Sequence, residues 1–307
     1  MIIGLFLTVI ALIGTLLSAA AARSWLADLA VHFRLQYALL ALAGCLVLAV
    51  TGHARWAAFA FLVAAIQALI CAPLLNARVP APPADSAACA PLRLAAINVW
   101  YRNRQFQRVV EFVGRERPDA VLFAEVTAEW EQKLAALDGE YAYRYVTRGT
   151  RGRGLLLLSR WPMQAAVLPG FSEEEPAVMA TLSIKDRSVE LLSVHTSWPM
   201  RPRSAVLRDR QLSLIAEFAR AHAGPHIVVG DLNVSPFSPH FHALLAGGNL
   251  KSAAQGFGWQ PTWPTFLAPA GIQIDHALIS AGVIVRSFRR GSQVGSDHLP
   301  IVIDCLV

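Results

Sequence analysis

Two stretches near the end of the chain decide the fold: residues 228–236 read VVGDLNVSP, and residues 295–303 read GSDHLPIVI. In each stretch, an apolar run of strand length meets acids, an amide or a histidine at one end. An apolar strand does not need such residues for its own packing. Asp231 and Asn233 lie two positions apart, so on an extended segment both side chains project from one face. The two stretches therefore predict buried strands whose ends carry chemistry.

Three more apolar segments, closer to the N-terminus, show the same arrangement. His195 closes VELLSVH, Glu125 closes AVLFAE, and Asn98 closes LRLAAIN. In the last stretch, Asp297 and His298 stand just before the strand begins. One polar residue at a strand end is normally an edge or capping residue. Five such ends, limited to acids, amides and histidines, predict a single assembled site.

Between these segments, apolar strands alternate with amphipathic helices. In the helix expected at 106–115, three valines share one face. The pattern indicates a mixed α and β domain in which two packed sheets are flanked by helices. The expected strands are 92–98, 120–124, 154–159, 177–184, 189–195, 227–230, 274–279 and 301–306, and the other expected helices are 129–137 and 204–223.

The first part of the 307-residue chain has a different composition. Charged residues make up 16% of the sequence and hydrophobic residues 55%, which argues against a disordered chain and against an ordinary soluble globule. Residues 1–22, 35–52 and 56–75 carry no charged side chain, and each run is long enough to cross a bilayer as a helix. We expect three transmembrane helices. The alternatives are a cleaved signal peptide for the first run and a buried soluble hairpin for the other two.

Together with the two stretches quoted first, four motifs carry a family resemblance: INVW, PDAVLFAEV, SVHTSWP and IDHALIS. The motifs occur in the order typical of the endonuclease/exonuclease/phosphatase (deoxyribonuclease I-like) superfamily, which the chain resembles. The three-helix N-terminus resembles a membrane-anchored bacterial branch of that superfamily. The resemblance implies an α/β (α+β) fold, a four-layer α/β sandwich of two packed mixed β-sheets flanked by helices, preceded by three transmembrane helices. It implies an anchor at 1–78, a Pro/Ala-rich linker at 79–91 and a catalytic domain at 92–307.

The resemblance implies a divalent metal, Mg²⁺ or Mn²⁺, held by Asn98, Glu125 and Asp297. Carboxylate and amide oxygens are the hard ligands that these ions prefer. Taken alone, Asn98 would more often be a turn residue, and the alternative for Glu125 is an acid at a helix N-terminus. Their position among the other strand ends favours the metal site.

The catalytic residues implied by the resemblance are His195, Asp231, Asn233, Asp275 and His298. In this interpretation His195 contacts the phosphate, and Asn233 donates to the charge that develops in the transition state. His298, oriented by Asp275, or Asp231 itself handles the protons, and the sequence leaves this choice open.

The substrate predicted by this site bears a phosphate, either lipid-linked or in a nucleic acid. Arg153 belongs to a basic loop with Arg144, Arg148 and Arg151, which would either hold phosphates or be solvated. The predicted function is a membrane-anchored, divalent-metal-dependent phosphohydrolase or phosphodiesterase, in which water attacks a phosphoester or pyrophosphate. The alternatives are a membrane-tethered endonuclease or exonuclease of the same fold and a non-catalytic binding module.

The predicted location is the bacterial inner (plasma) membrane, with several passes, but two observations conflict on the side that holds the domain. Arg23 and Arg34 in the first loop, against Arg55 in the second, favour a cytoplasmic domain. In the family fold the first and last strands are neighbours, which implies that Cys89 and Cys305 lie close enough for a disulfide. Because disulfides persist outside the cytosol, the prediction is a periplasmic domain.

Overall fold

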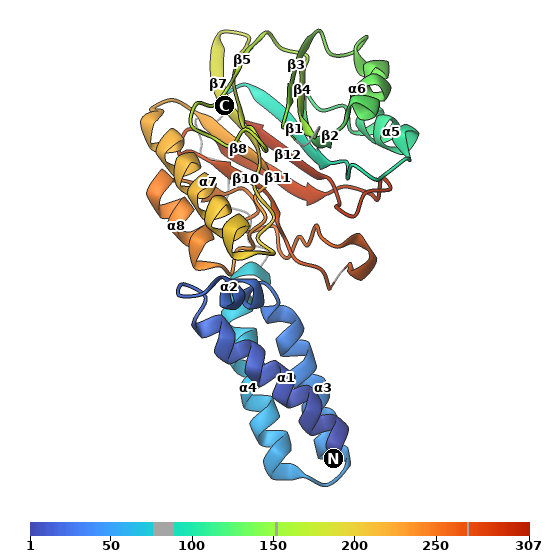
Figure 1. Ribbon diagram of the computed structural model, residues 1–307, viewed down its shortest axis with the longest axis vertical. Helices are drawn as coiled ribbons and strands as arrows, with labels where there is room; N and C mark the ends of the chain where they lie inside the picture. Colours follow the sequence, from blue (N-terminus) through green and yellow to red (C-terminus); the bar gives the residue numbers. More distant parts are fainter. Residues whose placement is uncertain (76–88, 151–152, 269) are drawn as a thin grey trace.

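The computed structural model describes residues 1–75, 89–150, 153–268 and 270–307. Figure 1 shows a bundle of helices at one end of the molecule and a larger domain of strands and helices at the other. We call the bundle the anchor. Its helices are α1 (Ile2–Ala19), α2 (Trp25–Val31), α3 (Arg34–Val50) and α4 (Ala54–Leu75). The predicted linker at 79–91 lies largely outside the described residues.

The anchor offers two to three candidate membrane spans. Within the described ranges, α1 and α4 each have the length and apolar composition needed to cross a membrane. The helices α2 and α3 meet the same test only as a pair, and they are bent against each other by 65°. The span predicted at 35–52 is therefore the 17-residue helix α3, which follows a break in the chain direction. The helix α2, which precedes this break, lies at the end of the bundle next to the domain (Figure 1).

The described strands form two six-stranded sheets. The pairs β1–β2 and β7–β8 are parallel, and the other pairs are antiparallel, so both sheets are mixed. The first sheet has the order β11 (Ile284–Arg290), β12 (Ile301–Leu306), β1 (Pro91–Asn98), β2 (Ala120–Val126), β4 (Gly154–Ser159) and β3 (Tyr143–Arg148). The second has the order β5 (Met163–Val167), β6 (Val178–Ile184), β7 (Arg187–His195), β8 (His226–Asp231), β10 (Asp275–Ile279) and β9 (Lys251–Ser252).

Helices cover the outer face of each sheet. Trp130 and Phe112, from α6 (Ala128–Leu134) and α5 (Phe106–Glu116), are buried against the first sheet. Ile215 and Phe241 do the same for the second sheet. Their helices are α7 (Pro202–Ala221) and α8 (Pro239–Gly248), and two short 3₁₀ helices, η2 (Ala135–Leu137) and η3 (Thr265–Leu267), complete the set.

A separate apolar core fills the space between the two sheets, where Leu122 of β2 and Val229 of β8 are buried together. The layers are thus helix, sheet, sheet, helix, and the predicted four-layer sandwich is confirmed. This arrangement lets each strand bury residues on both faces, which explains their nearly continuous apolar sequences.

Strand register brings the polar strand ends to one edge of the sandwich. In the parallel pair β7–β8, His195 is the partner of Asp231. In the antiparallel pair β8–β10, Asp231 is the partner of Asp275. Asn98, which closes β1 in the other sheet, donates from Nδ2 to Asp231 Oδ2 at 3.1 Å. Both sheets therefore contribute side chains to the same edge.

The anchor is packed against the domain. Val31 and Cys71 of the anchor share an apolar cluster with Phe237, which lies just before α8. Gln36 of α3 donates from Nε2 to the carbonyl of Ala270 at 2.7 Å. These contacts fix the anchor to the end of the domain that holds the loops after β8 and before β10.

The predicted disulfide between Cys89 and Cys305 is wrong: both are free thiols. β1 and β12 are antiparallel neighbours, as expected, but their register places Cys305 opposite Leu92. Cys89 lies three residues further along, about 10 Å at the rise of a strand, which no disulfide spans. The Cys305 thiol instead faces the Leu92 carbonyl at 3.4 Å. The argument from cysteines for a periplasmic domain is therefore lost.

Candidate active site

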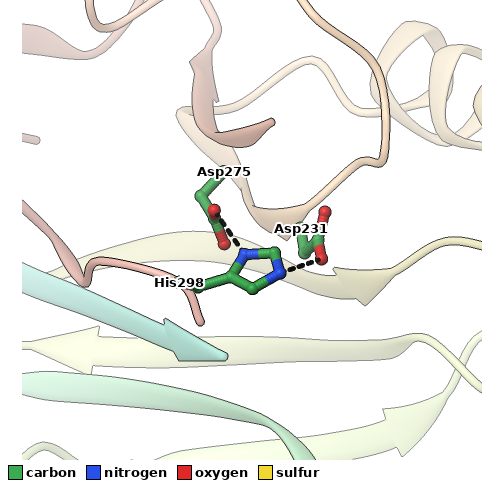
Figure 2. Close-up of side chains that lie close together, drawn as sticks. All are labelled: Asp231, Asp275 and His298. Carbon is green, nitrogen blue, oxygen red and sulfur yellow. Dashed lines mark hydrogen bonds and ion pairs between the residues drawn. The ribbon is translucent and has the colours of Figure 1, made fainter. Parts of the chain in front are cut away.

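Three buried side chains form the centre of the polar edge, as Figure 2 shows. His298 lies between Asp275, whose Oδ2 is 2.9 Å from Nδ1 of the ring, and Asp231, whose Oδ2 is 3.7 Å from Nε2. Thr262 fixes the start of β10 by accepting from the backbone N–H of Asp275 at 3.2 Å. One imidazole is thus held between two carboxylates away from bulk water.

The charges of this triad shift one another's pKa values. Burial alone would lower the pKa of His298, but Asp275 and Asp231 outweigh it and raise the pKa to about 10. Burial raises the pKa of Asp231 to about 6, against the opposing effect of His298. Burial acts in the same direction on Asp275, yet its charge interaction and hydrogen bond with His298 hold that pKa below the ordinary value. The arrangement keeps the imidazole protonated at neutral pH.

Glu125 stands at a distortion of β2. Its φ is +60°, in the left-handed region, and the pairing of β2 with β4 shifts register between Ala124 and Val126. A left-handed residue and a bulge are uncommon in a strand, and they turn the Glu125 side chain into the site. Its Oε2 accepts from the backbone N–H of Tyr101 at 3.1 Å.

Neighbouring positive groups stabilise the Glu125 carboxylate. Burial would raise its pKa, but His195, the Tyr101 N–H, His298 and Arg153 together hold it below the ordinary value. Glu125 therefore offers ionised carboxylate oxygens to the site at neutral pH.

Asn98 lies between two carboxylates. Its Nδ2 is 3.4 Å from Glu125 Oε1 and 3.1 Å from Asp231 Oδ2, while its Oδ1 accepts from the backbone N–H of Trp100 at 3.0 Å. The amide nitrogen thus faces the acids in this structure, and a role as an oxygen ligand requires the amide to turn over.

Asp297 has an oxygen atom that no protein group satisfies. Its Oδ2 accepts from Trp263 Nε1 at 3.3 Å, whereas its Oδ1 is buried and has no hydrogen-bond partner among the described residues. Burial raises the pKa of Asp297, and the charge of Glu125 acts in the same direction. Two close carboxylates with an unsatisfied oxygen are a donor set that fits a divalent cation.

His195, Asn233 and Arg153 complete the predicted set. His195 Nε2 is 3.7 Å from Asp231 Oδ2 and 3.9 Å from Glu125 Oε1. Arg153 Nη1 is 3.9 Å from Glu125 Oε2. Asn233 Nδ2 donates to the carbonyl of Thr196 at 2.8 Å. All nine predicted site residues therefore lie at this edge of the sandwich.

A cleft of about 970 Å³ opens over these residues. Arg153 lines it, and its guanidinium lies 4.6 Å from the ring centre of Tyr101. The prediction of a basic loop is wrong for Arg144 and Arg148, which lie in β3 and point elsewhere: Arg144 pairs with Asp138 at 2.8 Å and Arg148 with Glu131 at 2.5 Å. Arg151 lies outside the described residues. Of the three described arginines, Arg153 faces the cleft.

Sequence reasoning missed two hydroxyl groups that hold the site together. Ser296 donates from Oγ to the Asn98 carbonyl at 2.6 Å and accepts from the His298 N–H at 3.1 Å. Thr262 supports β10 from a loop. Ser296 stands directly before Asp297 in the quoted motif, so its position was visible, but no local pattern marks Thr262.

Comparison with known proteins extends these observations. The Endonuclease/Exonuclease/phosphatase family matches the chain over residues 95–298, from β1 to the histidine of the triad. No curated protein matches the sequence.

Several solved structures share the fold. Sphingomyelinase C from Streptomyces griseocarneus is 20% identical, with a TM-score of 0.53 over 70% of this chain and 99% of that one. D. rerio TDP2 complexed with single strand DNA product is 14% identical, with a TM-score of 0.57 over 70% and 99%. A mutant of beta toxin from Staphylococcus aureus with bound magnesium ions is 17% identical, with a TM-score of 0.54 over 70% and 99%.

At these identities the structural likeness establishes the fold and no more, while the family match covers most of the chain and every strand end described above. The chain belongs to the Endonuclease/Exonuclease/phosphatase family, whose members are metal-dependent hydrolases acting on phosphoester bonds.

Proposed function

We propose that this protein is a membrane-anchored phosphohydrolase or phosphodiesterase that uses Mg²⁺ or Mn²⁺ to hydrolyse a lipid-linked phosphoester or pyrophosphate. The observation that carries the proposal is the triad of Asp231, Asp275 and His298, of which Asp231 and His298 line the cleft. We assign residues 1–78 to the anchor, 79–91 to the linker and 92–307 to the catalytic domain.

The triad supplies the proton transfer in this proposal. His298, held protonated between two carboxylates, is not free to accept a proton from water. Asp231 is the acceptor, and its Oδ1 is already fixed by the N–H of Asn233 at 2.9 Å. Water attacks phosphorus in line, its proton passes to Asp231, and the bond to the leaving oxygen breaks. His298 Nε2 donates toward the phosphoryl oxygens, and Asp275 keeps its ring oriented.

The remaining polar groups hold the phosphate. His195 and Arg153 lie on the side of Glu125 that faces the cleft and donate to non-bridging oxygens. Asn233 offers its side-chain amide to the charge that grows on the phosphoryl group. Glu125 and Asp297, with Asn98 beside them, would hold the divalent cation. When bound, this cation would neutralise phosphate charge and stabilise the leaving oxygen.

An apolar rim beside the cleft favours a lipid substrate. Trp198, Met200, Val206, Phe266 and Leu267 have side chains between 48% and 81% exposed, and we call them the apolar rim. Trp198 and Met200 also line the cleft. In Figure 1, the N-terminal end of α7 and the orange-red loop that holds η3 lie at the end of the domain next to the anchor.

The loop with η3 connects the site and the anchor directly. The Thr265 N–H donates to the Asp297 carbonyl at 3.0 Å, and Gln36 of α3 binds the carbonyls of Ala270 and Gly271. Exposed aromatic and apolar side chains at this level of a membrane protein belong in the headgroup region. A lipid can therefore present its phosphate to the cleft while its chains stay in the bilayer.

A substrate comparison with the full-length protein in Mg²⁺-containing lipid vesicles tests the proposal. We expect phospholipid or prenyl phosphate in the vesicle to be hydrolysed faster than bis-p-nitrophenyl phosphate, and plasmid and oligonucleotide to remain intact. Cleavage of DNA with inert lipids would instead favour a tethered nuclease, and no turnover of any substrate would favour a binding module.

A pair of variants separates lipid access from chemistry in the same comparison. Phe266→Ser with Leu267→Ser should lower the rate on vesicle lipid several-fold and leave the rate on the soluble diester unchanged. Tyr143→Ser is the matched control, because Tyr143 is 36% exposed and pairs in register with Ser159, itself the partner of Ala120, at the end of the first sheet opposite Glu125. Equal losses on both substrates would show that the rim supports the fold and not the access of lipid.

The side of the membrane now depends on the arginines alone. Arg23 and Arg34 lie at the domain end of the anchor and Arg55 at the other end, which favours a domain in the cytoplasm. In spheroplasts, a membrane-impermeant maleimide should label Val50→Cys, which is 89% exposed at the other end, and should spare Val167→Cys until the membrane is opened. The reverse pattern would restore the periplasmic placement predicted from the sequence.

A further inference from the structure

A buried charge of the anchor is bonded to the catalytic domain. Asp28, in the short helix α2, is 1% exposed. Its Oδ2 accepts from Arg208 Nη2 at 2.5 Å, and its Oδ1 accepts from Ser238 Oγ at 2.5 Å. Arg208 belongs to α7 and is equally buried, while Ser238 caps the N-terminus of α8. One carboxylate of the anchor thus contacts both helices that cover the second sheet.

The same arginine reaches the site. Arg208 Nη1 donates to the backbone carbonyl of Asn233 at 2.9 Å. Its Nε donates to Asp209 at 2.7 Å, so the planar guanidinium is fixed on three sides. A continuous path of hydrogen bonds therefore runs from Asp28 through Arg208 to Asn233.

Asn233 needs this support because its backbone is in an uncommon conformation. Its φ is +47°, in the left-handed region. Two other bonds restrain it: its N–H donates to Asp231 Oδ1, and its side chain donates to the Thr196 carbonyl. Arg208 donates to the buried Asn233 carbonyl. It thereby restrains the peptide bond that follows the Asn233 Cα, the atom from which the side-chain amide projects.

Cohesion alone does not explain the ion pair. The anchor and the domain already share apolar contacts around Val31 and Phe237, and a buried ion pair often adds little net stability compared with apolar residues of similar size. What the pair supplies, and apolar residues would not, is an oriented donor to the Asn233 carbonyl.

We propose that Asp28 is a positioning residue for catalysis: through Arg208, the membrane anchor sets the geometry of Asn233. This inference rests on the proposed function, since it assigns the Asn233 amide to the transition state. It implies that the anchor completes the active site in addition to tethering it.

The test removes the path while avoiding an unpaired buried charge. In the full-length protein, the double variant Asp28→Leu with Arg208→Met replaces both charges by apolar side chains. We expect it to melt within a few degrees of the natural protein, with kcat reduced about tenfold or more and KM unchanged, because misplacing a group that acts in the transition state affects turnover and not ground-state binding. Asp28→Asn, which keeps the size of the side chain, should lose part of the same activity.

The control is Arg93→Met with Asp304→Leu, which removes a part-exposed ion pair of 2.5 Å between β1 and β12, at the end of β1 opposite Asn98. It should keep full kcat. A double variant at Asp28 and Arg208 with the kcat of the natural protein would overturn the proposal.

Hydrogen exchange of the peptide covering residues 231–238 gives a second readout that needs no substrate. Exchange should quicken in the Asp28 and Arg208 double variant and stay unchanged in the control. If the natural protein hydrolyses nothing, the proposed function fails, and unchanged exchange would overturn the positioning role by itself.

Discussion

Asp231→Asn and His298→Ala should each reduce kcat by about 10²-fold or more, the usual scale for general acid–base and electrostatic groups. Asp231→Asn removes the proton acceptor and keeps the shape of the side chain. His298→Ala removes the positive charge between Asp231 and Asp275. These two residues are register partners in β8 and β10, so their carboxylates then face each other without a cation between them. Steady-state kinetics with the preferred substrate, together with circular dichroism to confirm folding, measure both effects.

Asp275→Ala provides the graded comparison for these variants. Asp275 touches His298 on the side away from Asp231, so it orients the ring without meeting the phosphate. Its loss should cost less than the loss of His298. A folded His298→Ala protein with nearly normal turnover would contradict the assignment of the triad.

Removal of the divalent cation should abolish activity, and Glu125→Ala should lose most of it. The reason is the donor set: the ionised Glu125 and the unsatisfied Asp297 Oδ1 leave a concentration of negative charge that a cation neutralises. Activity in EDTA, and its recovery with Mg²⁺ or Mn²⁺, measures the first effect.

A measurement of cation binding separates this role from catalysis. Trp263 donates to Asp297 at 3.3 Å, so a bound Tb³⁺ should be sensitised by indole excitation. Luminescence should be lost in Glu125→Ala and retained in Glu129→Ala, an acid on α6 whose carboxylate pairs with Arg104 at the surface. Full turnover in EDTA, or by Glu125→Ala, would refute the metal site.

The parts of the fold that sequence could predict are those with a strong local pattern. The buried strands β1, β2, β4, β7 and β8 are nearly continuous apolar runs, and each was expected within a few residues. β3, β5, β9 and β11 were missed because they are the edge strands of the two sheets, with mostly half-exposed residues and no clear alternation.

The site was predictable for a related reason. Its residues lie at strand ends, where an acid or histidine stands out against apolar neighbours, as His195 does after Val194. Asp28 and Arg208 are separated by 180 positions, and each looks like a surface residue in its own helix. Only the packing of α2 against α7 reveals that both are buried.

The cysteine prediction failed on register and not on topology. The first and last strands are antiparallel neighbours, as expected, yet their register pairs Cys305 with Leu92, three residues from Cys89. Cys89 lies nine residues before Asn98 and Cys305 seven after His298, and these unequal counts already place the two cysteines at different levels of the paired strands.

With the anchor in a bilayer, as proposed, its docking on the domain would couple the thickness of the bilayer to the position of the domain. Helices of 18 and 22 residues, α1 and α4, are about 27 and 33 Å long at the rise of an α-helix. Hydrocarbon layers of different thickness are accommodated by changes in helix tilt. Since Asp28 of α2 and Gln36 of α3 hold the domain to the same bundle, a change of tilt in a bilayer would move the domain together with the bundle. In a bilayer, acyl-chain length would then set the height at which a phosphate is reached.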